Sequence, residues 1–266
     1  LDMARSTSIM TLQELLYTQG FGTRRVCAGL VEHGHVALRE GDQWTPCDDP
    51  WLEIAPEEGW PYRVQGVAWA YHRLAYLLLH KPAGTECSQR PSTWPSIYSL
   101  LPPPLRQRPN KSAVPGVQAV GRLDQDTTGL LILTDDGAMI HRMTSPRHHV
   151  PKVYEVGTAK PMDPSVVTQL LHGVVLHDDP RPVRAAACEL IEPHHLRLTL
   201  TEGKYHQVKR MLAATGHEVV SLHRSRMGQL ALPADVLPGQ WRWLSAQELA
   251  AANSPLQPPT TNPETP

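Results

Sequence analysis

The sequence predicts an α+β protein in two parts, a small N-terminal module and a larger second domain. Strand-like and helical stretches are mixed along the chain without the regular βαβ repeat that produces a doubly wound parallel sheet. The 266 residues are enough for two domains of unequal size. Residues 1–72 carry 5 basic and 10 acidic side chains, whereas residues 73–266 carry 20 and 16. We therefore place a domain boundary within residues 65–73.

The N-terminal module, residues 10–60, is predicted to be a small α/β unit of two short helices and a hairpin. Leucine and valine side chains recur at helical spacing on both sides of a glycine-containing turn at residues 20–23. Thr23 is the expected N-cap of the second helix, because its hydroxyl can accept a hydrogen bond from the first helical turn. Residues 35–39 then alternate as in a strand, and the Glu-Gly-Asp turn that follows predicts a hairpin.

The second domain, residues 73–250, is predicted to begin with a buried strand at residues 75–79, which ends in the sequence HKPAG. Residues 88–119 are rich in Pro, Ser and Arg and are expected to form a long basic loop with one helical turn near residues 97–101. A loop of this length in a compact domain is usually functional or disordered. Further strands are expected at residues 130–134, 154–157 and 196–200, and helices at 138–143, 164–172 and 204–215.

Three segments are expected to lie outside the two domains. Residues 61–72 are predicted to be a linker, because the composition shifts there. Residues 1–9 precede the first amphipathic pattern and are expected to be a leader or an expression remnant, with no secretory signal. Residues 251–266 are largely polar and rich in proline, a composition that predicts a disordered tail.

Composition argues against several classes of protein. The formal net charge of −1 argues against binding of nucleic acid through bulk positive charge. No apolar run approaches the roughly 18 residues of a membrane helix. The four cysteines form no CxxC pair, so we expect a reducing compartment and neither structural zinc nor a disulfide framework. The GxGxxG, P-loop and HExxH signatures are also missing, and the histidine pairs at 148/149 and 194/195 have no partner ligands at metal spacing, so we expect no metal site.

The segment with the clearest chemical potential is VGRLDQDTTG, residues 120–129. Its glycines allow a sharp turn and the close approach of a large ligand. In an extended stretch Arg122 and Asp124 share one face, since side chains two apart point the same way. This places a carboxylate that could act as nucleophile or base beside a cation that could meet a phosphate. The simpler alternative is a structural salt bridge within a loop.

Two further clusters are basic. Residues 202–211, EGKYHQVKRM, place four basic or potentially basic side chains at the start of a predicted helix. The alternative reading is an ordinary basic surface helix. Residues 145–154, SPRHHVPKVY, lead a cationic loop into a strand that carries Tyr154. A tyrosine that stacks on a base beside Arg and Lys is a common way to hold single-stranded nucleic acid.

In this order along the chain, the motifs resemble those of the RsuA-type pseudouridine synthases, which modify ribosomal RNA. The resemblance runs from about residue 73 to residue 249 and rests on HKPAG, GRLDQDTTGLLILTDDG, SPRHHVPKVYEV and EGKYHQVKRML. It implies a catalytic domain with a mixed, largely antiparallel sheet and flanking helices around a basic cleft. It also implies a reaction that needs no cofactor.

Residues 10–58 resemble the S4 RNA-binding domain that precedes the catalytic domain in this branch of the family. Seven carboxylates from Glu40 to Glu58 depart from a basic RNA-binding face. Arg24 and Arg25 are the RNA contacts expected to remain. We therefore expect the affinity for RNA to come from a local cleft in the second domain, with a smaller electrostatic contribution from this module.

By the resemblance, Asp124 is the catalytic aspartate of a reaction that breaks the N-glycosidic bond of a uridine, rotates the base and rejoins it through carbon. The carboxylate could attack C1′ of the sugar, attack C6 of the base or remove a sugar proton. Tyr154 is expected to stack on the base and to accept a proton in the last step. Lys209 would pair with Asp124 and keep it ionised, and Arg122 would help to hold the flipped nucleotide. Asp126 is assigned a structural role in the turn.

The remaining basic side chains of these motifs are expected to contact phosphates. They are Lys81, Arg147, Lys152, Lys204 and Arg210. The expected partner is ribosomal RNA in a partly assembled small subunit, and the enzyme is expected to be a cytoplasmic monomer without membrane contact. The motifs favour one uridine of 16S rRNA, at position 516.

Three alternatives remain open. A related synthase would act on 23S rRNA with the same core chemistry. A non-catalytic rRNA-binding or assembly factor would have lost the aspartate or the tyrosine, and both are present. A hydrolase with Asp124 and Asp126 as paired carboxylates is disfavoured, because residues two apart on a strand are poorly placed to flank opposite sides of a sugar.

Overall fold

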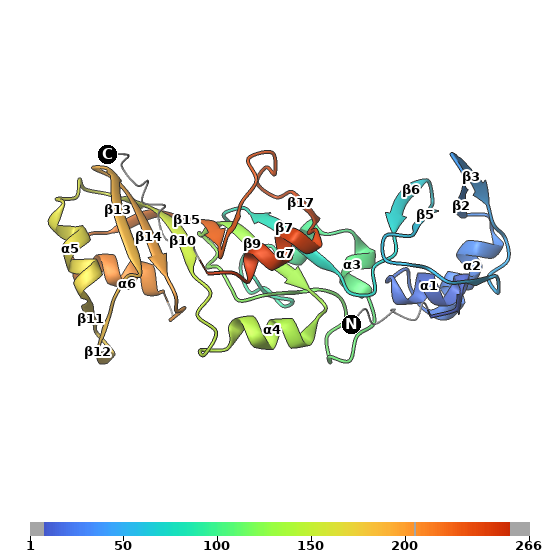
Figure 1. The fold of residues 1–266 in the computed structure, drawn as a ribbon, viewed down its shortest axis with the longest axis horizontal. Coiled ribbons are helices and arrows are strands. Elements are labelled where there is room, and N and C mark those ends of the chain that lie inside the picture. The colour runs from blue at the N-terminus through green and yellow to red at the C-terminus, as the bar shows by residue number, and fades with distance from the viewer. Residues whose placement is uncertain (1–7, 205, 256–266) are drawn as a thin grey trace, which may run out of the picture. The chain divides into compact units, whose positions relative to one another are not determined.

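The computed structural model describes residues 8–204 and 206–255, and its contacts divide the chain into two compact units. The first unit holds residues up to Ala75 together with Leu101–Gln118 and Thr134–Gly137. The second unit holds Tyr76–Leu100, Ala119–Leu133 and the residues from Ala138 onward. The predicted second domain, residues 73–250, is therefore not a single unit, because two of its segments pack with the N-terminal residues. Figure 1 traces the elements in chain order.

The first unit begins with two capped helices, α1 (Leu12–Thr18) and α2 (Arg24–Glu32). The side chain of Thr23 accepts a hydrogen bond from the backbone N–H of Val26, so the predicted N-cap is confirmed. The helices bury Leu12, Leu15, Leu16, Cys27 and Val31 against a four-stranded antiparallel sheet of order β3-β2-β5-β6. Its strands are β2 (Val36–Glu40), β3 (Gln43–Pro46), β5 (Pro61–Val64) and β6 (Val67–Ala70), and a separate pair joins β1 (Met10–Thr11) to β4 (Glu53–Ile54).

The prediction of a linker at residues 61–72 is wrong. These residues form the β5–β6 hairpin, and β5 pairs with β2 at the centre of the sheet. Tyr62 and Val64 are buried, while the intervening Arg63 is half-buried. This alternation is the period of a strand with one face on the core. The shift in charge composition that suggested a linker is a property of the solvent side chains and says nothing about burial.

Part of the predicted basic loop is also core structure. Residues 88–119 include the predicted turn, now a 3₁₀ helix at Ile97–Leu100, and the helix α3 (Pro103–Gln107). Arg108 is only 2% exposed, and its guanidinium donates to the carboxylate of Asp135 at 2.8 Å and to the backbone carbonyl of His72 at 2.8 Å. A buried guanidinium with such partners stabilises the packing of the unit and is not available to RNA.

The second unit is built on a nine-stranded sheet whose main path is β13-β14-β10-β15-β9-β7-β17. Strands β9 and β15 pair in parallel, whereas β13–β14, β14–β10, β10–β15, β15–β16 and β7–β17 are antiparallel. The predicted mixed, largely antiparallel sheet is therefore confirmed. The strands are β7 (Tyr76–Lys81), β8 (Gln118–Ala119), β9 (Thr128–Thr134), β10 (Lys152–Thr158), β13 (Ala187–Glu192), β14 (His195–Leu200), β15 (Val219–Met227), β16 (Leu230–Ala231) and β17 (Trp241–Trp243).

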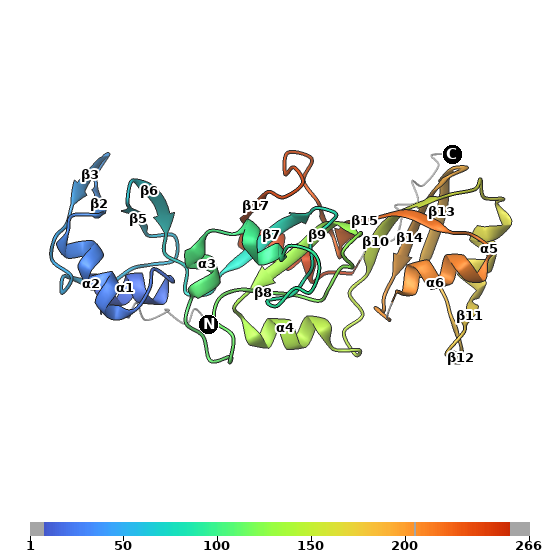
Figure 2. The same cartoon turned by 180° about the vertical axis from the view of Figure 1, so that it is seen from behind.

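Helices flank this sheet and close two hydrophobic clusters. The helices α5 (Ser165–His172) and α6 (Gln207–Ala214) pack with β10, β13 and β14, and Figures 1 and 2 both show them beside these strands. The helices α4 (Gly137–Thr144) and α7 (Ala246–Ala252) pack over β7 and β9. A small hairpin of β11 (Val174–Leu176) and β12 (Asp179–Val183) follows α5.

The two ends of the chain differ in part from their predictions. Residues 1–7 and 256–266 lie outside the described residues. Residues 251 and 252, predicted to belong to a disordered tail, instead end α7, whose start carries a capping box between Ser245 and Glu248. Ala252 is fully buried, which explains why this polar segment is ordered at its beginning. None of the helices formed by the described residues combines the length and apolar character that a bilayer crossing requires.

Candidate active site

The segment that carries Asp124 is a tight turn between β8 and β9. The backbone N–H of Thr127 donates to the carbonyl of Asp124 at 3.0 Å and closes the turn. Gly129 then enters β9 with a φ of +114°, and a Cβ at this position would lie 2.2 Å from the carbonyl oxygen of Arg224. Glycine is therefore required where β9 and β15 approach each other. This close pairing sets the turn beside β15.

Lys81 fixes the same turn from within the protein. Its side chain is fully buried, and its Nζ donates to the carbonyls of Pro82 at 3.0 Å, Gln125 at 3.2 Å and Thr127 at 2.9 Å. Burial lowers the pKa of this lysine below its ordinary value. The expectation that Lys81 contacts phosphate is wrong, because all its described contacts are internal. It is a structural cation under the turn.

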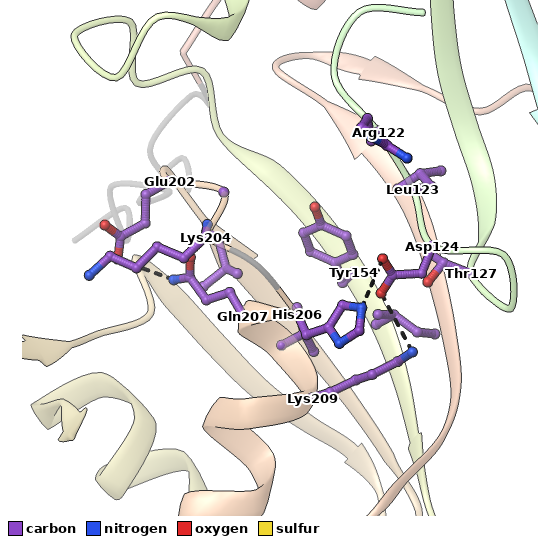
Figure 3. Close-up of a pocket in the computed structure, with 14 residues that line it drawn as sticks. Arg122, Leu123, Asp124, Thr127, Tyr154, Glu202, Lys204, His206, Gln207 and Lys209 are labelled. Carbon is purple, nitrogen blue, oxygen red and sulfur yellow. Dashed lines mark hydrogen bonds and ion pairs between the residues drawn. The ribbon is translucent and has the colours of Figure 1, made fainter. Parts of the chain in front are cut away.

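The Asp124 carboxylate contacts two groups from the start of α6. His206 Nε2 lies 3.3 Å from Oδ1, and Lys209 Nζ lies 3.5 Å from Oδ2. His206 precedes the helix in a left-handed conformation with a φ of 47°, which turns its ring toward the aspartate. Figure 3 shows the ring of Tyr154 beside this carboxylate. The geometry holds one half-exposed carboxylate between an imidazole and an ammonium.

Lys209 has a second and closer carboxylate partner. Its Nζ lies 2.9 and 3.0 Å from the two oxygens of Asp126, against 3.5 Å for Asp124. Burial opposes ionisation of Asp126, but the hydrogen bond and charge of Lys209 outweigh it, so the pKa of Asp126 is lowered. Burial likewise opposes protonation of Lys209, but both aspartates raise its pKa overall. Asp126 therefore shares the ammonium with Asp124, beyond the structural role in the turn that was predicted.

A pocket of about 110 Å³ opens beside Asp124 and is lined by Tyr154 and Arg122. Tyr154 lies on β10, half-buried, and Arg122 is exposed at the rim. The rest of the lining comes from the turn of Asp124, from β14 and β15 and from the start of α6: Leu123, Thr127, Leu200, Glu202, Gly203, Lys204, His206, Gln207, Val208, Lys209 and Leu222. The structure thus brings the three predicted catalytic side chains, Asp124, Tyr154 and Lys209, to one pocket.

Of the pocket residues that were not predicted as site residues, His206 and Gln207 support the site directly. His206 contacts Asp124 directly. Gln207 is buried, donates to Glu202 at 3.1 Å and accepts from the backbone N–H of Lys204 at 2.9 Å, so it supports the turn before α6. The sequence spacing could have identified His206. It lies three residues before Lys209, and this spacing places both residues on the same face near the start of a helix.

The predicted phosphate contacts of this unit fall into two groups. Lys204 Nζ is 2.7 Å from Asp179, and Arg210 contacts Asp178. These two cations are already paired with the β11–β12 hairpin. Lys152 and Arg147 have no such carboxylate among the described residues; Lys152 is half-buried and Arg147 is exposed.

The predicted contacts of the first unit lie on the first turn of α2. Arg24 is paired with Glu14 at 3.0 Å, and its guanidinium lies 3.9 Å from the centre of the Tyr17 ring. Arg25 is exposed. Of the two arginines, only Arg25 has its charge directed to solvent without a carboxylate among the described residues.

Residues 75–214 match the family model described as RNA pseudouridylate synthase, which covers more than half of the chain. The chain belongs to this family. It is 38% identical over 233 residues to "Ribosomal small subunit pseudouridine synthase A" of Escherichia coli strain K12, which covers 88% of this chain and 96% of the relative. The protein of the same name from Yersinia pestis is 41% identical over 180 residues, or 68% of this chain and 73% of the relative.

A solved structure of this pseudouridine synthase family has the same fold. The structure described as "Crystal structure of pseudouridylate synthase" aligns with a TM-score of 0.61 and 30% identity, over 91% of this chain and 99% of that one. This enzyme is an RNA pseudouridine synthase of α+β architecture. Among the described residues of the synthase, no group of three His, Cys, Asp or Glu side chains is placed to hold a metal ion.

Proposed function

We propose that this synthase converts a single uridine of 16S rRNA, at position 516, to pseudouridine, with Asp124 as the catalytic carboxylate. The single observation that carries the chemistry is the Asp124 carboxylate, held by His206 and Lys209 at the pocket that Tyr154 lines. The choice of RNA is supported by relatives that cover most of the chain and are named for the ribosomal small subunit. This substrate would place the enzyme where ribosomal subunits are assembled. We further propose that the enzyme acts as a monomer.

The proposed reaction is an isomerisation in which atoms balance within the nucleotide and water. The bond between C1′ and N1 breaks, the base turns, and a bond between C1′ and C5 forms. C5 loses its proton, and N1 ends as an N–H. The target must first leave its base stack, because the glycosidic bond is inaccessible within a helix. Arg122, which lines the pocket, is proposed to contact the flipped nucleotide.

Asp124 is proposed to start the cleavage of the glycosidic bond. Attack on C1′, attack on C6 and removal of a sugar proton all require an oriented carboxylate, and its contacts with His206 and Lys209 supply that orientation. Tyr154 is proposed to stack on the base and to accept the C5 proton in the last step. A paired-carboxylate hydrolase is disfavoured further by the structure, since Asp124 and Asp126 converge on one ammonium and so approach from one side.

The first unit is proposed to act as an S4-like RNA-binding module. The support is its two-helix and four-stranded architecture and the exposed Arg25. Because Arg24 is paired with Glu14 and the unit is rich in carboxylates, we expect it to supply a minor share of the salt-dependent affinity.

The direct test uses RNA labelled with tritium at C5 of uridine. The full-length protein is incubated with 16S rRNA, with partly assembled small subunits and with 23S rRNA, and tritium released to water is counted. Release from the small-subunit substrates is expected. Absence of release from every RNA, with protein shown to be folded, would refute the proposed activity and favour a non-catalytic assembly factor.

The position of the product is tested separately. Carbodiimide-blocked primer extension on rRNA from cells with and without the gene maps each pseudouridine. We expect one stop to be lost in 16S rRNA. A stop lost in 23S rRNA would preserve the chemistry and overturn the choice of substrate.

A further inference from the structure

A second cavity adjoins the pocket of Asp124. It encloses about 420 Å³ and lies between the end of α4, the start of β10 and the turn before α6. Arg122, Tyr154 and the turn of Glu202–Lys204 line both spaces, so they form a common wall. A nucleotide whose base occupied the first pocket would therefore have its backbone close to the second cavity.

Arg224 forms part of the floor of this cavity. Its side chain is only 2% exposed, and its Nε donates to the carbonyl of Leu130 at 2.9 Å. Its Nη2 is buried and has no hydrogen-bond partner among the described residues. A buried charged donor without an acceptor is costly, and native structures seldom tolerate one unless a ligand or water completes it. The guanidinium is locked in place with a donor still unused.

Lys152 adds a second cation to the same cavity. It lies two residues before Tyr154 on β10, so the two side chains share one face of the strand. Tyr154 is in turn directly opposite Arg224 in the pairing of β10 with β15, which brings all three to one face. No described carboxylate forms an ion pair with Lys152. Burial, and then the nearby Arg224, lower the pKa of Lys152 to about 8.

Little negative charge faces these two cations. Glu202 is the one carboxylate among the described residues that line the cavity, and it already accepts a hydrogen bond from Gln207 at 3.1 Å. Besides Lys152 and Arg224, the other titratable side chains of the lining are His148, His149, Arg122, Tyr154 and Lys204. The cavity is therefore a cationic site in which neither Lys152 nor Arg224 is paired with a carboxylate of the described residues.

We propose that this cavity binds the RNA phosphodiester next to the flipped uridine, with Arg224 and Lys152 as its ligands. The proposal rests on the proposed function, because it assumes that a uridine occupies the Asp124 pocket. A phosphate supplies both what Nη2 lacks, an oxygen acceptor, and the negative charge that two neighbouring cations favour. The volume exceeds what a phosphate needs and leaves room for part of the adjoining nucleotide.

The test asks whether removing the charge of one side chain and the charge of one phosphate affects RNA affinity independently. Binding of the full-length protein to a labelled RNA fragment, spanning the uridine mapped by primer extension, is measured by fluorescence anisotropy. Fragments carry a neutral methylphosphonate in place of the phosphate on the 5′ or the 3′ side of that uridine. Lys152→Met removes the ammonium and keeps an unbranched stem. Lys160→Met, at an exposed lysine outside the cavity, is the matched control.

For the wild-type protein we expect one methylphosphonate to weaken binding by about tenfold, as for loss of a charged hydrogen bond. Lys152→Met should weaken binding to the unmodified RNA by a similar factor. The affinity of this variant should fall little further when the RNA carries that methylphosphonate. The slope of log K against log salt should fall by about 0.7 to 0.9 in the same variant. Lys160→Met should match the wild type in affinity.

Three results would overturn the proposal: unchanged affinity and slope for Lys152→Met, no effect of either methylphosphonate, or additive losses when both changes are combined. Arg224→Lys, checked for folding by its thermal melt, should also reduce the effect of the methylphosphonate. Tritium release measured on the same preparations separates this proposal from the proposed function. Tritium release together with additive effects of Lys152→Met and the methylphosphonate would support the proposed activity and reject the phosphate site. Non-additive effects without tritium release would support the phosphate site and reject the proposed activity.

Discussion

The cations on the two sides of the site, the start of α6 and the strands β10 and β15, differ in their partners. On the α6 side, Lys204, Lys209 and Arg210 each contact a carboxylate. On the sheet side, Lys152 and Arg224 have no carboxylate among the described residues. Paired cations orient neighbouring groups, whereas cations without a carboxylate partner retain the capacity to bind an incoming anion. A basic motif can therefore have a structural role or be available to bind an anion, and the partners of its side chains decide which.

The largest expected effect separates the two carboxylates that share Lys209. Asp124→Asn should lower turnover by about a thousandfold or more, because the carboxylate that is proposed to act on the nucleotide is lost. Asp126→Asn is the matched control, since Lys209 and His206 still contact Asp124, and it should keep most of the activity. Tritium release measures both, with RNA binding expected to stay near the wild-type value. Near-normal turnover in Asp124→Asn would remove it from the catalytic role.

The next effect concerns Lys81, whose hydrogen bonds among the described residues all go to backbone carbonyls. Lys81→Met should lower the free energy of unfolding by about 2 kcal/mol, because three carbonyls lose their donor inside the protein. Lys204→Met, which breaks an exposed ion pair, should change it by less than about 1 kcal/mol. Urea titrations followed by circular dichroism make the comparison. Equal stability in the two variants would show that Lys81 is not a structural cation.

A pH dependence should mark the sheet side. Because the pKa of Lys152 is lowered to about 8, the free protein loses this charge as pH rises through 8. A bound phosphate favours the protonated form and raises the pKa, so RNA affinity should fall between about pH 8 and 9.5 by up to about tenfold. The titratable groups that line the cavity with Lys152 are Tyr154 from β10, Arg224 from β15, His148 and His149 from the preceding loop, and Arg122, Glu202 and Lys204 from the flanking turns.

The control for this dependence is Lys152→Arg, which keeps its charge throughout this range. Its affinity should be flat where the wild-type affinity declines. A decline of the same size in both proteins would assign the titration to another group of the cavity.

The smallest effect should come from the α6 side. Asp179→Asn frees Lys204 from its 2.7 Å ion pair and leaves the lysine able to meet a phosphate. Since exposed pairs contribute about 0.2 to 1 kcal/mol, RNA affinity should rise by at most a few fold, and only at low salt. Anisotropy titrations at two salt concentrations measure this. A large gain would mean that the hairpin competes with RNA for this cation.

Local patterns predicted the regular elements well. The N-cap at Thr23 was predicted from one residue and its neighbours, and the strand at 130–134 from an apolar run, now part of β9. The strands β13 and β15 were missed because their half-buried, partly polar residues become strands through pairing with distant segments. The hairpin at 61–72 was missed because charge composition was weighed above the alternation of buried side chains.

The roles of the lysines could not be predicted from the sequence. Four of the six lysines lie in the motifs, which marked them as important. The structure separates them: Lys81 is buried under a turn, Lys204 and Lys209 are paired, and Lys152 lines a cationic cavity. Arg224 lies in none of the motifs. Its significance depends on the Nη2 donor, which is buried without a hydrogen-bond partner among the described residues, and burial of such a donor is unfavourable.

The sequence by itself determined the α+β class and the order of the motifs, because residue type and short spacing are local properties. The set of Asp124, Tyr154 and Lys209 was predicted from the resemblance of those motifs to a known family. Only the tertiary structure decided that Lys209 is shared with Asp126, that His206 contacts Asp124 and that Lys81 is internal. It also decided that a second, cationic cavity lies behind Tyr154. Burial and charge pairing depend on residues far apart in the chain, so no local pattern specifies them.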